Sequence, residues 1–241
     1  MRYLITFSYD GTNFSGYQKQ PNKRTVQEEI ESVLSRINNK NVSISSTGRT
    51  DAKVHALNQK AHFDLDKNWD LNRLKHSLNM LLPSDIYIKN IEKVDNDFHA
   101  RFNVKKKIYV YKINLGEYNP IDRNYIYQYN KDLNIDKITM ACKYFIGEHD
   151  FTSFTKLDEP KNCIRNIFDL NITFENNLLM IKFEGNGFLR YMVRNIVGTL
   201  LAVGEGKIEP QEIKTIIEHK NRQEAFLTAP PEGLYLYDVY Y

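Results

Sequence analysis

The order of strand-like and helix-like segments constrains the fold of this chain more than any other feature of its sequence. Residues 3–9 alternate in polarity and are rich in β-forming side chains, which predicts a strand. Apolar residues from Val26 to Ile37 recur at helical spacing, and Thr25 with Glu28 forms a capping-box pattern before them. The remaining predicted elements are a strand at 42–45, a loop at 47–57, a strand at 61–65, a helix capped by Asp70 that stops before Pro83, and a strand at 86–94. The first half therefore has the predicted order β-α-β-β-α-β.

The second half of the chain repeats this order coarsely, without sequence similarity to the first half. Its predicted elements are a strand at 104–115, a helix from Asn134, a hairpin of 164–174 with 178–183, a helix at 188–203, a shorter helix after Pro210 and a strand at 234–240. Both halves match the ferredoxin-like, or RRM-like, arrangement, in which helices pack on a mainly antiparallel sheet. We therefore expect an α+β protein with two domains, 1–103 and 104–241.

The composition excludes several classes of protein. The two cysteines, Cys142 and Cys163, stand in no Cys/His cluster, so we expect no disulfide scaffold, structural zinc site or iron–sulfur cluster. The first residues show no signal-peptide pattern, and Arg190 and Arg194 interrupt the apolar stretch 188–203, so we expect no membrane span. The sequence lacks GxGxxG and P-loop patterns, which argues against a nucleotide cofactor. These features predict a protein of the reducing cytoplasm.

The net charge is too small to indicate a nucleic-acid-binding protein, since 33 basic and 30 acidic residues give +3. The basic residues are concentrated, however. Residues 101–112 contain five of them and no acid. In a strand, Lys105, Lys107, Tyr109 and Tyr111 would share one face and set cations beside aromatic rings, as in proteins that stack an unpaired base. The alternative is a solvated strand face with extended lysine side chains.

Two further groups of basic residues allow the same two interpretations, a contact with nucleic acid or a solvated surface. Arg190 and Arg194 are four residues apart, which would place them on one face of the predicted helix, where they could clamp a phosphate or a carboxylate. The loop 19–24 carries Lys19 and Arg24 and no acid. Isolated surface cations are usually only solvated, so these groups alone do not decide the function.

The loop at residues 46–55 contains the pattern most typical of chemistry. Gly48, Arg49 and Asp51 stand close together between two predicted strands. An arginine beside a carboxylate lowers its pKa and keeps it ionised, as a nucleophile or a general base requires. Alternatively, Asp51 forms an Asx-turn and has only a structural role.

Seven sequence blocks, in order along nearly the whole chain, resemble the TruA family of tRNA pseudouridine synthases. The central block is GRTDAKVHA at 48–56, and a single block of this kind would be weak evidence. The other six blocks lie at 9–18, 97–102, 107–111, 147–154, 187–198 and 229–234.

The resemblance implies a pseudouridine synthase fold with two halves around a central basic cleft. It implies isomerisation of uridine to pseudouridine in the anticodon stem-loop of tRNA, at positions 38–40, without cofactor or metal. It assigns Asp51 as the catalytic nucleophile, Tyr109 as the tyrosine against the target uracil and Arg194 as the arginine that pairs with the aspartate. It also implies a homodimer. The remaining residues that we expect to bind RNA are Arg49, Lys107, Arg190, Lys53, Arg101, Lys19 and Arg24.

The chain departs from the family pattern at four positions. The family usually has Trp at Tyr17, Gly at Lys53, Ala at Thr47 and Arg at Lys107. All three catalytic positions are retained, whereas Tyr17 and Lys53 fall in segments expected to face RNA and bear on which uridines are modified. Two other functions remain open: an RNA-binding protein without activity, and a hydrolytic glycosidase, which usually needs a second carboxylate.

Overall fold

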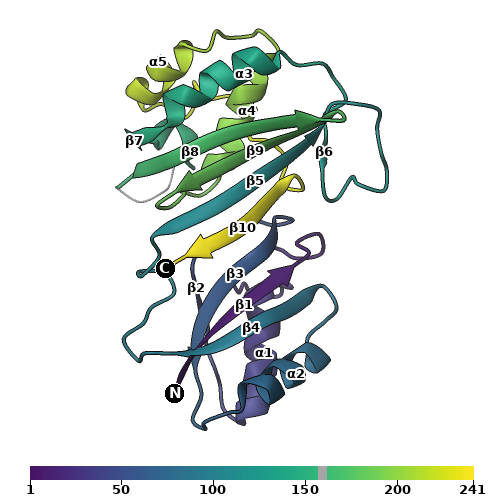
Figure 1. Cartoon of the computed structure of the whole chain (residues 1–241), viewed down its shortest axis with the longest axis vertical. Coiled ribbons are helices and arrows are strands. Elements are labelled where there is room, and N and C mark those ends of the chain that lie inside the picture. Colours follow the sequence, from purple (N-terminus) through teal and green to yellow (C-terminus); the bar gives the residue numbers. More distant parts are fainter. Residues whose placement is uncertain (157–161) are drawn as a thin grey trace. The chain divides into compact units, whose positions relative to one another are not determined.

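A computed structural model of the chain describes residues 1–156 and 162–241, which form two compact units (Figure 1). The N-terminal unit comprises residues 1–105 with 235–241, and the C-terminal unit comprises residues 106–234. The expected C-terminal domain, 104–241, included the final strand, β10 (Leu234–Tyr240). In the structure β10 pairs in parallel with β3 (His55–Asp64), through Tyr235 with His55 and Leu236 with Ala56. This pairing joins the end of the chain to the N-terminal unit.

The N-terminal unit has a sheet with the strand order β4-β1-β3-β10. Strands β1 (Arg2–Tyr9), β3 and β4 (Ile86–Val94) pair antiparallel, and the two-residue strand β2 (Ser45–Ser46) pairs with β3. Helices α1 (Val26–Asn38) and α2 (Leu71–Leu81) lie next to each other against this sheet (Figure 1). The predicted order of elements is confirmed for this half. The strand predicted at 42–45 is reduced to β2, and β3 begins at His55, so the loop predicted to end at residue 57 is shorter.

The two helix starts in this unit follow different chemistry. The Asp70 carboxylate accepts a hydrogen bond of 2.9 Å from the Arg73 amide, so the predicted N-cap of α2 is confirmed. The capping box predicted at Thr25 is wrong. Thr25 does occupy the N-cap position of α1, but it makes no side-chain capping bond, and its buried hydroxyl has no hydrogen-bond partner among the described residues. The Thr25 side chain therefore packs in the interior at the start of α1 and does not cap the helix.

The C-terminal unit has an antiparallel sheet with the strand order β5-β9-β8-β7. Its strands are β5 (Lys106–Asn114), β7 (Gly147–Asp150), β8 (Ile164–Glu175) and β9 (Leu178–Gly185), and β6 (Tyr127–Gln128) pairs in parallel with β5. Helices α3 (Ile135–Cys142), α4 (Met192–Gly204) and α5 (Glu212–His219) pack together beside the sheet, with two short 3-10 turns at 143–145 and 152–154 (Figure 1). The predicted β8–β9 hairpin is confirmed. Its turn residues Asn176 and Asn177 have φ of 51° and 61°, values typical of a tight hairpin turn.

Helix α4 begins later than the sequence predicts. Its predicted start was residue 188, but Tyr191 has a left-handed φ of 63°, and the helix begins at Met192. Arg190 therefore lies before the helix, and the prediction that Arg190 and Arg194 share one helical face is wrong. Most of α4 is buried, because other segments of the unit cover several of its faces. No helix in the described part of the chain is long and apolar enough to cross a membrane.

Candidate active site

Asp51 lies in the loop 47–54, between β2 and β3 of the N-terminal unit, and its side chain is half-buried. A second loop, residues 10–18, supports the backbone of this Asp51 loop. The Tyr17 amide donates to the Thr50 carbonyl at 3.1 Å, and the Lys53 amide donates to the Phe14 carbonyl at 3.4 Å. These bonds fix the chain on both sides of Asp51.

The fully buried Gln59 of β3 holds the start of the Asp51 loop. Its amide oxygen accepts from the Thr47 hydroxyl at 2.6 Å, and its amide nitrogen donates to the Gly48 carbonyl at 2.9 Å. A third bond, from the Lys60 amide to the Gln59 oxygen, measures 3.2 Å. The alanine usual in the family at position 47 could not make the hydroxyl bond, so Thr47 adds a contact that the family pattern lacks.

The end of β1 approaches the same loop. The Tyr9 hydroxyl shares a hydrogen bond of 2.8 Å with the Thr50 hydroxyl. Burial raises the pKa of Tyr9 to about 12, against smaller opposing contributions from Thr50 and Gln59, so the phenol stays protonated at neutral pH. Gly11 passes so close that a Cβ there would lie 2.1 Å from the Val54 carbonyl oxygen. A side chain at position 11 would therefore displace the Asp51 loop.

Two cations flank Asp51 in sequence, and both are exposed. Arg49 donates through Nη1 to the Gln18 side-chain oxygen at 2.6 Å, which ties it to the supporting loop. Lys53 has a left-handed φ of 65°. Glycine adopts this backbone conformation readily, which gives a physical reason for the glycine usual in the family at this position. The Asp51 loop thus presents one carboxylate between two exposed cationic side chains.

Tyr17, in a segment expected to face RNA, does not expose its side chain. Its side chain is buried, and its hydroxyl has no hydrogen bond of good geometry among the described residues. Burial raises the pKa of this phenol strongly, and the nearby Ser46 hydroxyl lowers it by less. Tyr17 is therefore a packing residue beneath the Asp51 loop.

Tyr109 lies on β5 of the C-terminal unit with only 8% of its surface exposed. Its ring meets that of Phe188 edge to face, with 5.2 Å between the ring centroids. The expected row of cations beside exposed rings is wrong at Tyr111, which is fully buried and donates from its hydroxyl to the Pro230 carbonyl at 2.6 Å. Lys107, two residues before Tyr109, is half-buried on the same strand.

Arg190 and Arg194 converge on one ring although they do not share a helical face. The guanidinium carbons of Arg190 and Arg194 lie 5.0 Å and 5.3 Å from the centroid of the Tyr191 ring. The left-handed turn at Tyr191 makes this convergence possible. Arg194 also donates from Nε to the Ala229 carbonyl at 2.7 Å. Burial raises the pKa of the Tyr111 phenol well above its ordinary value, and the nearby Arg194 charge lowers it by less. Two positive charges therefore gather at the start of α4.

The other expected RNA-binding residues have different surroundings. Arg24 makes ion pairs of 2.7 Å with Asp85 and 2.8 Å with Glu29, and it lies over the Phe14 ring, so its guanidinium holds the loop in place. Lys19 is exposed and lies 3.7 Å from Glu28. Arg101 is exposed in the segment between β4 and β5.

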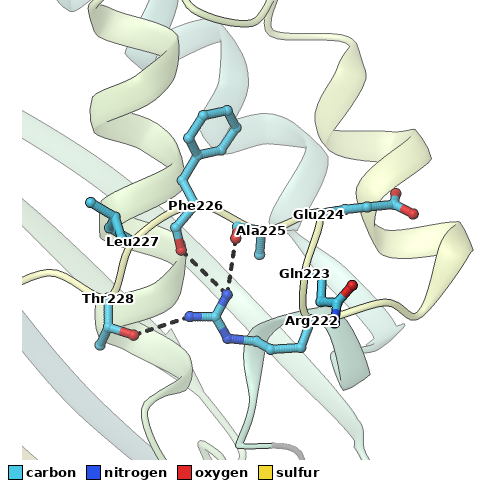
Figure 2. A pocket seen from close by; sticks show the side chains of 7 residues that line it. All are labelled: Arg222, Gln223, Glu224, Ala225, Phe226, Leu227 and Thr228. Atoms are coloured by element: carbon cyan, nitrogen blue, oxygen red, sulfur yellow. Dashed lines mark hydrogen bonds between the residues drawn. The ribbon is translucent and has the colours of Figure 1, made fainter.

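A pocket lined by residues 222–228 lies in the segment that follows α5 (Figure 2). Arg222 donates to the carbonyls of Ala225 and Phe226 and to the Thr228 hydroxyl. These bonds close the segment on itself, and a further bond of 3.0 Å from Arg222 to the Asn195 side-chain oxygen ties the segment to α4. Outside residues 157–161, the structure contains no group of three or more His, Cys, Asp or Glu side chains that could hold a metal ion.

Sequence reasoning found the Asp51 loop and missed the residues that hold it, Tyr9 and Gln59. The sequence does contain one indication of the role of Gln59. It lies two residues before Ala61 and four before Phe63, so all three side chains point to the same buried face of β3. Within the N-terminal unit the structure brings together Asp51, Arg49 and Lys53. Within the C-terminal unit it places Tyr109 and Lys107 on β5, and Arg190 and Arg194 at the start of α4.

The sequence blocks around these residues match known proteins. A profile of the tRNA pseudouridine synthase family matches residues 5–103 and 141–241, which include Asp51 and Arg194. The chain belongs to the tRNA pseudouridine synthase family. The expected family, the isomerase class and the pseudouridine synthase fold are therefore confirmed.

Curated relatives match over nearly the full chain. The tRNA pseudouridine synthase A of Thermosipho melanesiensis is 47% identical over 99% of this chain and 98% of its own length. Proteins of the same name in Caldicellulosiruptor bescii (99% of this chain) and, as tRNA pseudouridine synthase A 1, in Bacillus cereus (100% of this chain) are each 45% identical, over 98% of their own lengths. The chain thus covers nearly the full length of these relatives.

Proposed function

We propose that this chain converts uridine to pseudouridine in the anticodon stem-loop of tRNA, at positions 38–40. The observation that carries the proposal is Asp51, a single half-buried carboxylate on a loop held by buried hydrogen bonds, within a chain of this family. Such a loop holds a reactive group in one geometry, which is the main requirement for catalysis by positioning. The proposal names tRNA as the substrate because the full-length relatives carry that name.

The reaction needs one ionised carboxylate and no change of oxidation state. The bond between uracil N1 and ribose C1′ breaks, a bond between C5 and C1′ forms, C5 loses its proton and N1 gains one. We assign Asp51 as the nucleophile, acting at C1′ or C6, with removal of the C2′ proton as the alternative. Arg194 supplies the positive charge that keeps the carboxylate ionised, and Tyr109 lies against the uracil and takes part in the proton transfer at C5.

The target uridine must leave its stem before it can react, so binding of the RNA backbone precedes the chemistry. We propose that Arg49, Lys53, Lys107 and Arg190 contact phosphates, because each is a cation close to the assigned catalytic residues in sequence. We propose the same role for the exposed side chains of Lys19 and Arg101. Arg24 has a weaker claim, because its guanidinium is committed to two carboxylates.

We further propose that the chain acts as a homodimer in the cytoplasm. The dimer lets one tRNA meet cations of two subunits, which compensates for a net charge of only +3. The cytoplasm is where such a tRNA substrate is found. Sedimentation equilibrium of the purified protein tests the dimer, since a mass of one chain would contradict it.

Product analysis separates this function from its two alternatives. The wild-type protein is incubated with unmodified tRNA, and the RNA is then digested to nucleosides and analysed by mass spectrometry after chemical labelling of pseudouridine. We expect pseudouridine at positions 38–40 and no free uracil. Free uracil would indicate a glycosidase, and tight tRNA binding without product would indicate an RNA-binding protein without activity.

A further inference from the structure

The segment between β4 and β5 carries a large aromatic side chain in an exposed position. The Phe102 ring has 76% of its surface exposed, although it belongs to the compact N-terminal unit. Leaving a phenylalanine ring in water forgoes the favourable free energy of its burial. Scattered exposed apolar residues need no explanation, so a function for Phe102 requires further observations.

The first such observation is that the turn under Phe102 is fixed by hydrogen bonds. The amides of Phe102 and Asn103 donate to the His99 carbonyl at 3.1 Å and 3.0 Å. The Asn103 side-chain oxygen accepts from the His99 amide at 2.6 Å, and the His99 ring nitrogen Nδ1 accepts from the Arg101 amide at 3.1 Å. Phe102 is therefore held in place before any partner arrives, which reduces the entropy cost of binding.

The second observation is that Phe102 ends a series of ring contacts that runs from the interior to the surface. Its ring lies on that of His99 with centroids 4.3 Å apart and an interplanar angle of 31°. The His99 ring in turn meets that of His62 at 4.7 Å. Burial lowers the pKa of His62, so this imidazole is neutral and accepts from the Ala100 amide at 3.1 Å. The exposed face of the Phe102 ring is therefore where a further ring could stack.

The third observation is the charge around the ring. The guanidinium carbon of Arg101 lies 5.9 Å from the Phe102 centroid, and the side chain is exposed. The hydrogen bond with Asp64 is the main cause of a raised pKa of Arg2, and Asp97, one of the two carboxylates that precede the turn, adds to it. A cation beside an exposed ring matches a phosphate beside a base.

We propose that Phe102, with His99 behind it and Arg101 beside it, is a stacking platform for an unpaired base of the tRNA substrate. Only an unpaired, unstacked base has a free face for the ring, because neighbouring bases cover both faces inside a helix. Arg101 contacts the phosphate next to that base. This inference rests on the proposed function, since it takes tRNA as the ligand.

Fluorescence gives a direct test, because the chain has a single tryptophan, Trp69. The Trp69 Nε1 makes no hydrogen bond among the described residues, so Trp69→Phe removes the native signal without removing such a bond. In that background, Phe102→Trp places a fluorophore on the platform. We expect tRNA to quench its emission, with saturation at the same concentration as tRNA binding. The matched control is Tyr87→Trp, on β4 of the same unit with 53% exposure, which should not be quenched.

Affinity measurements separate stacking from simple apolar contact. We expect Phe102→Ala and Phe102→Leu each to weaken tRNA binding by about 5- to 100-fold and Phe102→Trp to preserve it. Full affinity of Phe102→Leu, or unquenched emission from the Phe102→Trp protein at saturating tRNA, would overturn the platform. Dissociation of a dimer by Phe102→Ala, with tRNA affinity unchanged, would instead make this surface a contact between copies of the chain.

The two proposals fail in different ways. If wild-type protein forms pseudouridine but the Phe102 variants bind tRNA normally, only the platform is refuted. If Phe102→Trp is quenched by tRNA but wild-type protein forms no pseudouridine, only the proposed reaction is refuted.

Discussion

The substitution Gln59→Glu perturbs the Asp51 loop with almost no change of shape. Glutamate keeps one oxygen that can accept from the Thr47 hydroxyl and the Lys60 amide, but an ionised carboxylate has no hydrogen to donate to the Gly48 carbonyl. The Gly48 carbonyl therefore loses its Gln59 donor and faces a negative oxygen. The Ser46 hydroxyl remains a weaker donor to it, at 3.2 Å.

The size of the effect follows from burial. Gln59 is fully buried, so losing the 2.9 Å bond to Gly48 costs about 1–3 kcal/mol. For a chain of this length each kcal/mol lowers Tm by about 2–4 °C, which gives an expected fall of about 2–12 °C. Because Gly48 lies three residues before Asp51, we expect kcat to fall at least tenfold while KM for tRNA changes less than threefold.

The pH dependence of the variant distinguishes positioning from general damage. Burial and the nearby carbonyl favour the protonated form of the introduced carboxyl group, and this form can again donate to Gly48. The variant should therefore regain activity relative to wild type as the pH falls, and lose it as the pH rises. The assay is kcat and KM from tritium release between pH 5.5 and 8.5, with Thr25→Val as a control in the same unit. An unchanged kcat, or a loss carried by KM alone, would refute the positioning role.

Three further predictions concern stability. Thr25→Val should leave the free energy of unfolding unchanged or raise it by up to about 1 kcal/mol, because the Thr25 hydroxyl is buried without a partner among the described residues. A decrease of about 1 kcal/mol in the free energy of unfolding, measured in urea, would instead support a capping bond from Thr25. Gly198→Ala should destabilise by about 2 kcal/mol or more, since its Cβ would lie 1.7 Å from the Leu227 carbonyl oxygen, whereas Gly187→Ala, with contacts of 3.8 Å, should be tolerated; equal Tm values would contradict this. Burial raises the pKa of Tyr9 to about 12, above its unfolded value, so stability should fall as pH rises from about 10 to 12, and Tyr9→Phe should flatten this slope in a Tm series.

Much of the fold could be predicted from the sequence because its signals are local. The Asp70 cap, the Asn176–Asn177 turn and the alternating apolar residues of the strands each depend on a few neighbouring residues. The errors arise where distant contacts override local preference. Thr25 has the sequence pattern of a cap, yet packing buries its hydroxyl, which has no hydrogen-bond partner in the part of the chain that the structure describes.

The site shows the same division. Asp51 stands in a short pattern that any reader of the sequence can find, but the residues that hold its loop are distant from it along the chain or ordinary in type. The role of the Gln59 amide can be recognised only when the pairing of β3 and its buried face are known. The left-handed φ of Tyr191 places Arg190 outside the helix, so the helical spacing of Arg190 and Arg194 is lost. Both guanidinium groups nevertheless lie near the Tyr191 ring. Such features depend on tertiary structure and have no periodic signature.

The most direct test of the central claim is tritium release from tRNA labelled at uracil C5, measured for Asp51→Asn in single turnover. The substitution keeps the size of the side chain and removes its charge, and Asp132→Asn, at an exposed site of the other unit, is the matched control. We predict that Asp51→Asn releases no tritium above background while its Kd for tRNA stays within threefold of wild type, and that Asp132→Asn behaves as wild type. Tritium release by Asp51→Asn at a rate within tenfold of wild type would contradict the assignment of Asp51 as the catalytic carboxylate.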